Sequence, residues 1–245
     1  MDKRPFFDNY LTSHYSNCEK IDLNDDNSLL ELLDKNVVVI NRNLGNIFKR
    51  NVSLDSKVLD LGCGYGSFIK FLQNNFYSNV TGVDLSGEEL AVCRKLFPEY
   101  RFYQQDIEDY ARTNGEKYDV IYLSHVLEHI EKVNLSGFLR DMKSLLNDGG
   151  YLIIIVPNSA AYFNAMATRY GDITHEVGFT NNNLNQLLLV AGFNKFALMN
   201  YYGTDNVMYL FIRKMLLLLF EMLIRSLGYD KQKIYTPSLL AIIQK

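Results

Sequence analysis

Short apolar runs alternate with helical patterns through the middle of this chain, and that alternation constrains the fold more than any other feature. The runs are Lys57–Gly62, Asn79–Leu85, Tyr100–Asp106, Tyr118–Ser124 and Tyr151–Val156. Helical patterns lie between them at Phe68–Phe76, Glu88–Phe97 and Phe138–Leu146. Because helical crossovers join parallel strands, the pattern predicts an α/β domain with a mostly parallel sheet and right-handed crossovers.

Further elements are expected on both sides of this alternation. Residues 28–49 place apolar side chains at near-helical spacing, which predicts a helix before the first strand. After residue 180 we expect a helix at Leu184–Ala191 and strands at Lys195–Tyr202 and Ser238–Gln244. Between those two strands, the apolar segment Val207–Gly228 predicts another helix.

The 245 residues suit one α/β domain with additions, and 48% apolar residues suffice for a sizeable core. We divide the chain into an N-terminal arm and cap helix (1–50), a Rossmann-like core (51–204), an apolar helical insertion (205–236) and the last core strand (237–245). These parts form one domain rather than a string of independent ones.

Charge and cysteine content favour certain classes of protein. A net charge of −3 argues against a dedicated nucleic-acid binder. The three cysteines, Cys18, Cys63 and Cys93, fit free thiols in a reducing compartment. The first residues contain no apolar signal-peptide region, so we expect a cytoplasmic protein.

A glycine-rich loop follows the first predicted strand, reading Asp60-Leu61-Gly62-Cys63-Gly64-Tyr65-Gly66. Its glycines allow a tight turn and let a ligand approach the main chain closely. Asp84 ends the second strand, at the sheet edge where open α/β folds bind ligands, and its carboxylate can accept both hydroxyls of a ribose. The G-x-G-x-G spacing differs from the G-x-G-x-x-G of dinucleotide-binding domains, which disfavours an NAD-binding alternative.

Over about residues 55–200 these motifs resemble the class I SAM-dependent methyltransferases. The resemblance implies a Rossmann-like seven-stranded sheet with an antiparallel last strand, and S-adenosyl-L-methionine (SAM) as cofactor. The glycine loop is similar to the motif that wraps the methionine part, and Asp84 to the ribose-binding acid. The cofactor-binding residues that it implies are Asp60, Gly62, Cys63, Gly64, Gly66, Asp84, Leu85, Asp106, Ile107 and Ser124.

Three of the four histidines fall in two short motifs after the fourth and fifth strands. On a helix, His125, Glu128 and His129 would share one face, and His175 lies in a loop at the same sheet edge. Imidazoles suit removal of a hydroxyl proton, and a His/Glu cluster also suits a divalent metal. We predict catalytic roles for these four residues and no metal site; a divalent metal is the alternative.

A structural alternative applies to part of this cluster. His129 could instead hydrogen-bond a backbone carbonyl, and Glu128 could brace a loop amide.

The histidine cluster is similar to sites in several methyltransferase families. One resemblance is to the E-x-x-E-H…H metal site of small-RNA 2′-O-methyltransferases, at His125, Glu128, His129 and His175. Quinone O-methyltransferases carry a related stretch. This chain has His125 where both families have the first Glu. The stretch Leu123–Ile130, with Asp172–His175, looks more like bacterial methyltransferases of polysaccharide biosynthesis and sugar modification.

The last resemblance implies O-methylation of a sugar or glycan-linked hydroxyl. The alternatives are O-methylation of an aromatic or quinone precursor, and metal-assisted RNA 2′-O-methylation. From a different class, the chain would be an inactive SAM-binding partner subunit.

Missing motifs narrow the acceptor. After the fourth strand there is no Asn-Pro-Pro-Tyr motif for flipped amino bases and no Pro-Cys nucleophile, which argues against methylation of DNA. There is no double-glutamate loop of the kind that protein-arginine methylation requires. We therefore expect a small-molecule or glycan acceptor and no DNA partner.

The N-terminal arm has two interpretations. Phe6, Phe7, Tyr10 and Tyr15 belong either to a lid over the cofactor or to a loosely packed arm, and His14 is expected at the surface.

The insertion Val207–Gly228 is apolar around most of its circumference, apart from a narrow stripe of Lys214, Glu221 and Arg225. Its charges keep it from forming an uncharged membrane-spanning run. We expect it to pack on the domain beside the acceptor pocket, or to form a homodimer interface. Peripheral membrane contact is the less favoured alternative, because such helices normally carry many cations.

Overall fold

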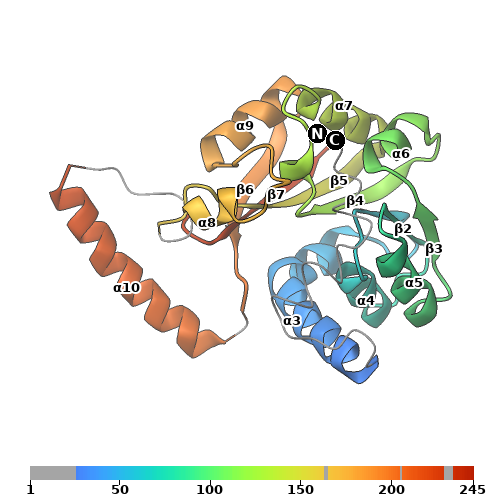
Figure 1. The fold of residues 1–245 in the computed structure, drawn as a ribbon, viewed down its shortest axis with the longest axis horizontal. Helices are drawn as coiled ribbons and strands as arrows, with labels where there is room; N and C mark the ends of the chain where they lie inside the picture. Colours follow the sequence, from blue (N-terminus) through green and yellow to red (C-terminus); the bar gives the residue numbers. More distant parts are fainter. Residues whose placement is uncertain (1–25, 163–164, 205, 229–233) are drawn as a thin grey trace.

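Seven strands form one sheet in the order β3-β2-β1-β4-β5-β7-β6 (Figure 1). The computed structural model describes residues 26–162, 165–204, 206–228 and 234–245. Neighbouring strands are parallel except for β7, which runs antiparallel to both β5 and β6. The predicted fold, including its antiparallel last strand, is confirmed.

The strands match the predicted apolar runs with shifted ends. They are β1 (Val58–Leu61), β2 (Val80–Asp84), β3 (Arg101–Gln104), β4 (Tyr118–Ser124), β5 (Leu146–Pro157), β6 (Lys195–Tyr201) and β7 (Ser238–Gln244). The central strand β1 is buried at every residue, because helices cover both faces of a doubly wound sheet. This burial explains why its sequence is a continuous apolar run, interrupted only by Asp60.

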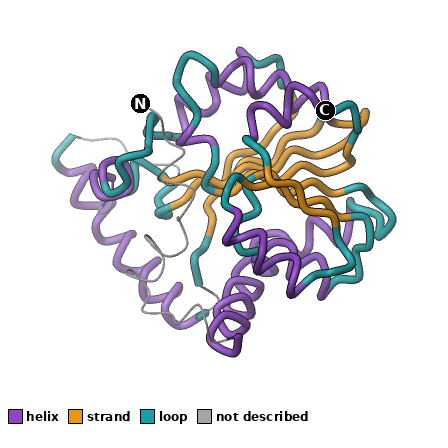
Figure 2. Tube along the Cα trace, turned by 45° about the vertical axis from the view of Figure 1, so that its right-hand side comes forward, coloured by secondary structure: helices purple, strands orange, loops and turns teal. Residues whose placement is uncertain are grey.

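Helices cover the two faces of the sheet (Figures 1 and 2). One layer holds α3 (Asp26–Asn51), α4 (Ser67–Asn74) and α5 (Gly87–Leu96), and the other α6 (Ile107–Thr113), α7 (Leu135–Leu145) and α9 (Asn181–Val190). Each layer packs its apolar face on the sheet and forms one of two cores. Two short elements, α6 and α8 (Ala165–Tyr170), were not predicted, because six or seven residues show little helical periodicity.

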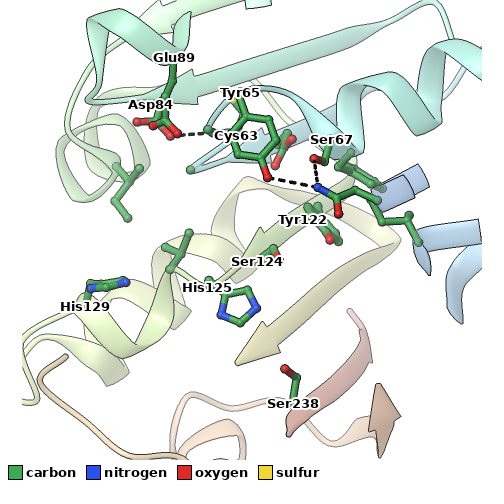
Figure 3. A pocket seen from close by; sticks show the side chains of 18 of the residues that line it. Cys63, Tyr65, Ser67, Asp84, Glu89, Tyr122, Ser124, His125, His129 and Ser238 are labelled. Carbon is green, nitrogen blue, oxygen red and sulfur yellow. Dashed lines mark hydrogen bonds between the residues drawn. The ribbon is translucent and has the colours of Figure 1, made fainter. Parts of the chain in front are cut away.

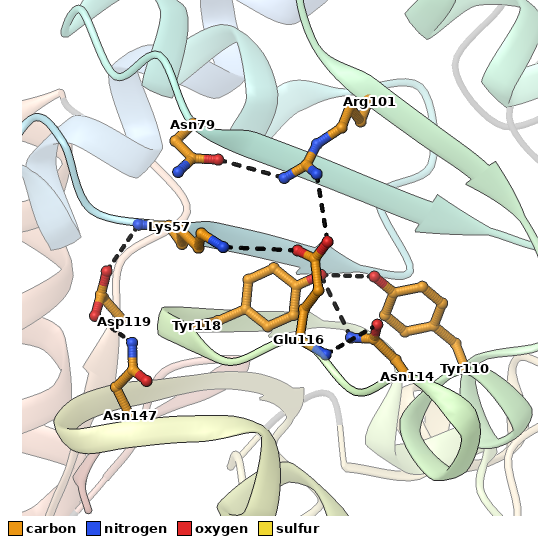
Figure 4. Close-up of polar contacts among 9 residues, drawn as sticks. All are labelled: Lys57, Asn79, Arg101, Tyr110, Asn114, Glu116, Tyr118, Asp119 and Asn147. Atoms are coloured by element: carbon orange, nitrogen blue, oxygen red, sulfur yellow. Dashed lines mark hydrogen bonds and ion pairs between the residues drawn. The ribbon is translucent and has the colours of Figure 1, made fainter.

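The amino ends of the strands are joined by polar contacts (Figure 4). Asp119 accepts hydrogen bonds from the Lys57 backbone N–H at 2.8 Å and from Asn147 Nδ2 at 2.7 Å. The hydroxyls of Tyr110 and Tyr118 lie 2.6 Å apart. These contacts fix the starts of β1, β4 and β5, at the edge opposite the glycine loop.

The predicted helix in the insertion is confirmed as α10 (Val207–Ser226). The prediction that this helix packs on the domain is wrong for most of its surface. Ten of its large apolar side chains are about half exposed or more, and Leu217 is the buried one among those described. Figure 1 shows α10 standing outside the sheet and its helical layers. None of the helices in the described part of the chain is long and apolar enough to span a membrane.

Candidate active site

A cavity of about 1450 Å³ opens at the carboxyl ends of β1, β2 and β4. All of the residues predicted to bind the cofactor line it except Gly66. Gly66 instead begins α4 with a left-handed φ of 91°, and a Cβ there would lie 2.8 Å from the Phe97 ring. Gly66 is therefore needed for the turn and for packing rather than as part of the cavity wall, and its predicted contact with the cofactor stays a prediction.

The glycine loop is tied to β2 through Asp84 (Figure 3). Asp84 Oδ2 accepts from the Gly64 N–H at 2.8 Å, and Oδ1 accepts from the Ser86 N–H at 2.9 Å. Burial raises the pKa of Asp84, although these backbone hydrogen bonds oppose the rise. Each carboxylate oxygen has a second lone pair, so this fixed carboxylate can still accept from a ribose diol.

Two further carboxyl groups lie close to Asp84. Asp60 is 1% exposed, and its Oδ2 has no hydrogen-bond partner among the described residues. Burial and the charge of Asp84 raise the pKa of Asp60 well above its usual range. The same two causes, with the charge of Glu88, raise the pKa of Glu89 to about 8. Carboxyl groups crowded in this way need either protons or a cation.

Glu89 lines the cavity, and the sequence analysis did not identify it. Its Oε1 would lie 3.3 Å from a Cβ at Gly64, so it stands directly beside the glycine loop. The available signal was the spacing of Ser86 and Glu89, which matches a capping box. That pattern predicts the start of α5, where Ser86 accepts from the Glu89 N–H at 3.3 Å, but it does not predict a ligand contact.

These features fit SAM. The carboxyl groups suit its ammonium and sulfonium charges, and Leu85 and Ile107 offer apolar surface at the other end of the cavity. When bound, SAM supplies an electrophilic methyl group on its sulfonium. Asp106 lines the cavity and also caps α6, because its Oδ1 accepts from the N–H groups of Glu108 and Asp109.

The histidine cluster forms without the predicted helix. His125 has a left-handed φ of 56°, and only a short 3-10 turn, η2 (Leu127–His129), follows it. The prediction that three residues share one helix face is therefore wrong, since the chain turns sharply after β4. His125 and Glu128 still meet, with 3.2 Å between His125 Nδ1 and Glu128 Oε1.

The His125 ring is exposed to the cavity, near Ser124 and Ser238 (Figure 3). Withdrawal from bulk water alone would lower the pKa of His125, but the hydrogen bond and charge of Glu128 outweigh this and raise it. Glu128 itself is 1% exposed. If the Nδ1 proton is held by Glu128, Nε2 is the nitrogen left to accept a proton.

His129 is oriented by a second set of contacts. The Thr174 hydroxyl lies 2.6 Å from Asp172 Oδ1, which can only accept, so its oxygen accepts in turn from His129 Nδ1 at 2.8 Å. Burial and the nearby His175 lower the pKa of His129, despite the charge of Glu128. Its ring is therefore neutral at neutral pH, and Nε2 is its unprotonated nitrogen.

His175 lies beside this pair but away from the cavity. Its ring centroid is 4.8 Å from that of His129, and it is not among the described residues that line the cavity. Arg169 holds the loop in place by donating to the carbonyl oxygens of His175 and Glu176. The Glu176 N–H also donates to the Glu128 carbonyl, so the loop after β5 is fastened to η2.

Glu128, His129 and His175 could together hold a divalent metal ion. Each offers one ligand atom, and these atoms lie within 4.8 Å of one another. Glu128 Oε2 has no hydrogen-bond partner in the described part of the chain, and Thr174 would act as an outer partner for His129. These donor types suit a divalent metal ion. The sequence-based prediction that the site holds no metal ion therefore stays a prediction.

The cavity extends beyond the cofactor residues to a set that the sequence did not single out. Asn36 donates to the Tyr65 hydroxyl at 3.1 Å and to Ser67 Oγ at 3.0 Å. Further lining residues come from α3, the sheet and the start of α10; they include Tyr122, Tyr201, Asn206, Tyr209 and Ser238. They are far apart in sequence, and only the folded chain brings them together.

Comparisons with known proteins agree with this geometry. A family model described as a methyltransferase domain matches residues 31–198. The ubiquinone biosynthesis O-methyltransferase of Glaesserella parasuis is 33% identical over 121 residues, 46% of this chain and 50% of that protein. The sphingolipid C9-methyltransferase of Candida albicans is 27% identical over 142 residues, 54% of this chain and 26% of that one. The chain thus spans about half, or less, of the length of these relatives.

Solved structures share the fold. A SAM-dependent methyltransferase from Archaeoglobus fulgidus superposes with a TM-score of 0.65 at 18% identity, over 90% of this chain and all of that one. Another from Clostridium acetobutylicum gives 0.61 at 15% identity, over 96% of this chain and 98% of that one. With the family model covering more than half of its length, the chain belongs to the methyltransferase domain family, within the class I SAM-dependent methyltransferases.

Proposed function

We propose that this enzyme methylates a hydroxyl group of an aromatic acceptor of the quinone-precursor type. The observation that carries the proposal is the pairing of His125 with the buried Glu128 at the cavity wall, 3.2 Å apart. This pair provides a base for a hydroxyl proton. Similarity to the ubiquinone biosynthesis O-methyltransferases supports an aromatic acceptor.

The chain's own groups would act mainly by positioning. Asp84 and the glycine loop orient the cofactor, while Asp60 and Glu89 balance its positive charge. His125 Nε2 removes the proton of the acceptor hydroxyl, and the carboxylate of Glu128 stabilises the imidazolium that forms. Holding donor and acceptor in line supplies most of the remaining rate enhancement, and no covalent enzyme intermediate is needed.

A sugar or glycan-linked hydroxyl is the second candidate acceptor. Amide and hydroxyl groups at the far end of the cavity favour it, because Asn36, Ser67 and Ser238 can exchange hydrogen bonds with sugar hydroxyls. Nearby tyrosines can pack against either a sugar or an aromatic ring.

The cluster of Glu128, His129 and His175 supports a metal-assisted version of either reaction. A divalent ion held there would lower the pKa of a coordinated hydroxyl. Activity that is lost with a chelator and restored by Mg²⁺ or Mn²⁺ would support this version; indifference to the chelator would leave His125 as the base.

The test is transfer of labelled methyl from SAM to two panels, dihydroxylated benzoates and nucleotide sugars. We expect methylated product from the dihydroxylated benzoates, with the labelled methyl group on oxygen. Product from nucleotide sugars alone would favour the second candidate. If the protein binds SAM yet methylates neither panel, an inactive partner subunit becomes the better interpretation.

A further inference from the structure

One side of α10 presents a continuous apolar surface to solvent. The described residues between 46% and 68% exposed on this helix and just beyond its end are Met208, Tyr209, Phe211, Ile212, Met215, Leu216, Leu218, Leu219, Met222, Leu223 and Leu227. At 3.6 residues per turn they occupy one half of the helix circumference. A contiguous patch of this kind marks an interaction site.

The rest of the helix carries both apolar and charged residues. Leu217, on the other side, is 8% exposed, and the Phe220 ring packs at 5.1 Å from Tyr162. The charged residues Lys214, Glu221 and Arg225 also lie outside the apolar half. The helix thus turns its apolar half outward, which is the reverse of an ordinary surface helix.

The centre of the apolar half carries a regular seam. Met208, Ile212, Met215, Leu219 and Met222 follow one another at intervals of four, three, four and three residues. A 3.5-residue average repeat keeps one stripe of side chains facing a partner helix along its length.

The area of the surface suits a protein interface. An aromatic side chain buries about 150–250 Å² and a Leu, Ile or Met side chain somewhat less, so eleven side chains that are about half exposed offer on the order of 1,000 Å². A stable interface needs about 800 Å² from each partner. One helix pairing, with some contact from neighbouring loops, therefore reaches the size that a stable dimer requires.

The charges favour protein over lipid as the occupant. Helices that lie on membranes carry many cations along their polar side. The sequence of α10 contains three cations, Arg213, Lys214 and Arg225, and one anion, Glu221. The three cations less one anion give a net charge of +2, whereas anionic-lipid sites typically gather about four to eight Lys and Arg.

We propose that a second copy of this chain covers the apolar half of α10, the two α10 helices packing along this seam about a two-fold axis. Such an isologous interface is the commonest way for a soluble chain to close its apolar surface. Asn206 and Tyr209, at the start of the helix, line the cavity, so the interface adjoins the acceptor end of the site.

The test measures mass in solution, independently of activity and of the proposed function. Sedimentation of the full chain should give twice the mass of one chain. Leu219→Glu, on the seam, should dissociate it to a folded monomer, whereas the matched Val133→Glu, at a residue 83% exposed elsewhere, should leave the dimer intact.

A second variant covers the case in which Leu219→Glu misfolds. Leu219→Cys should give a cross-linked dimer with a bismaleimide, and Val133→Cys should not. A wild-type monomer at micromolar concentration would overturn the proposal, as would a Leu219→Glu variant that stays dimeric. Monomers that float with vesicles of phosphatidylcholine and phosphatidylglycerol would assign the face to lipid instead.

Discussion

At the amino edge of the sheet, Asp119 has a hydrogen-bond partner for each carboxylate oxygen, and Glu116 stands near both Lys57 and Arg101. At the carboxyl edge, Asp60 Oδ2 and both carboxylate oxygens of Glu128 are buried with no hydrogen-bond partner among the described residues, although Glu128 Oε1 lies 3.2 Å from His125 Nδ1. Folding stability alone would favour satisfied groups at both edges, because an unpaired buried polar atom is costly.

The difference indicates which edge is built for chemistry. The amino edge holds strands together, and cations or amide donors of the chain lie beside its carboxylates. Even Glu116 Oε2, which has no hydrogen-bond partner among the described residues, lies 3.9 Å from Lys57 Nζ. The carboxyl edge places carboxyl groups with raised pKa beside the glycine loop, and a cationic ligand bound there would stabilise their charged forms. Substitutions at the carboxyl edge should therefore weaken SAM binding, whereas those at the amino edge should lower stability and leave SAM binding unchanged.

The largest difference is expected from two glycines. Gly64→Val should abolish detectable SAM binding, because Gly64 has a φ of +50° and its Cβ would lie 3.3 Å from Glu89 Oε1. Gly115→Val, near the amino edge, points into open space and should bind SAM normally. Calorimetry on both variants checks this; equal affinities would remove the glycine loop from the cofactor site.

The second-largest effect is expected when the proposed catalytic base is removed. His125→Ala should reduce kcat by roughly 100-fold or more while SAM affinity stays nearly unchanged. Glu128→Gln should lower kcat less, because it keeps the shape and loses the charge. His175→Ala serves as the control that lies away from the cavity, and a larger loss for it than for His125→Ala would favour the metal-assisted version.

Replacing an aspartate at each edge should give a smaller difference in SAM affinity. Asp84→Ala should weaken SAM binding by about 1–3 kcal/mol, since it removes charge-assisted hydrogen bonds. Asp119→Ala should leave SAM binding alone and lower the free energy of unfolding by about 1–3 kcal/mol, since two donors lose their acceptor. Asp84 also accepts from the Gly64 and Ser86 N–H groups, so both variants should lose stability and only Asp84→Ala should weaken SAM binding. Calorimetry and denaturant titration measure the two effects, and an equal loss of SAM affinity in Asp119→Ala would contradict the comparison.

The pH dependence of the rate is the finest of these tests. A base must be unprotonated, so the rate rises with pH through the pKa of that group and is flat above it. The raised pKa of His125 puts this rise above the ordinary histidine value of about 6.5, whereas the lowered pKa of His129 would put it below. A rise below that value, retained in His125→Ala, would transfer the role of base to His129.

The sequence predicted the parts that depend on local pattern. The alternation of apolar runs predicts the sheet, and the glycine loop with Asp84 marks the edge that binds ligands. It could not show that the chain turns left-handed at His125, since that conformation depends on contacts with β5 such as the His125 N–H bond to Ile155. Nor could it show the acceptor end, where Asn36 and Ser238, from opposite ends of the chain, line the same cavity.

The same limit applies to two other features. Glu89 matches a capping box, and only the fold shows that it also faces the glycine loop. For α10, periodicity predicts a helix but cannot show which half faces outward, because that depends on how the helix is joined to β6 and β7. The predicted lid residues Phe6, Phe7, Tyr10 and Tyr15, together with His14 and Cys18, lie outside the described residues.

The central claim is that the crowded carboxyl groups at the carboxyl edge are arranged to receive a cationic cofactor. A cation bound among them lowers their pKa, so groups such as Glu89, with a pKa of about 8 in the free protein, must release protons. Calorimetric titration with SAM at about pH 7, in two buffers of different ionisation enthalpy, measures that release. The account predicts net proton release that decreases in Glu89→Gln; SAM binding with no proton release would contradict it.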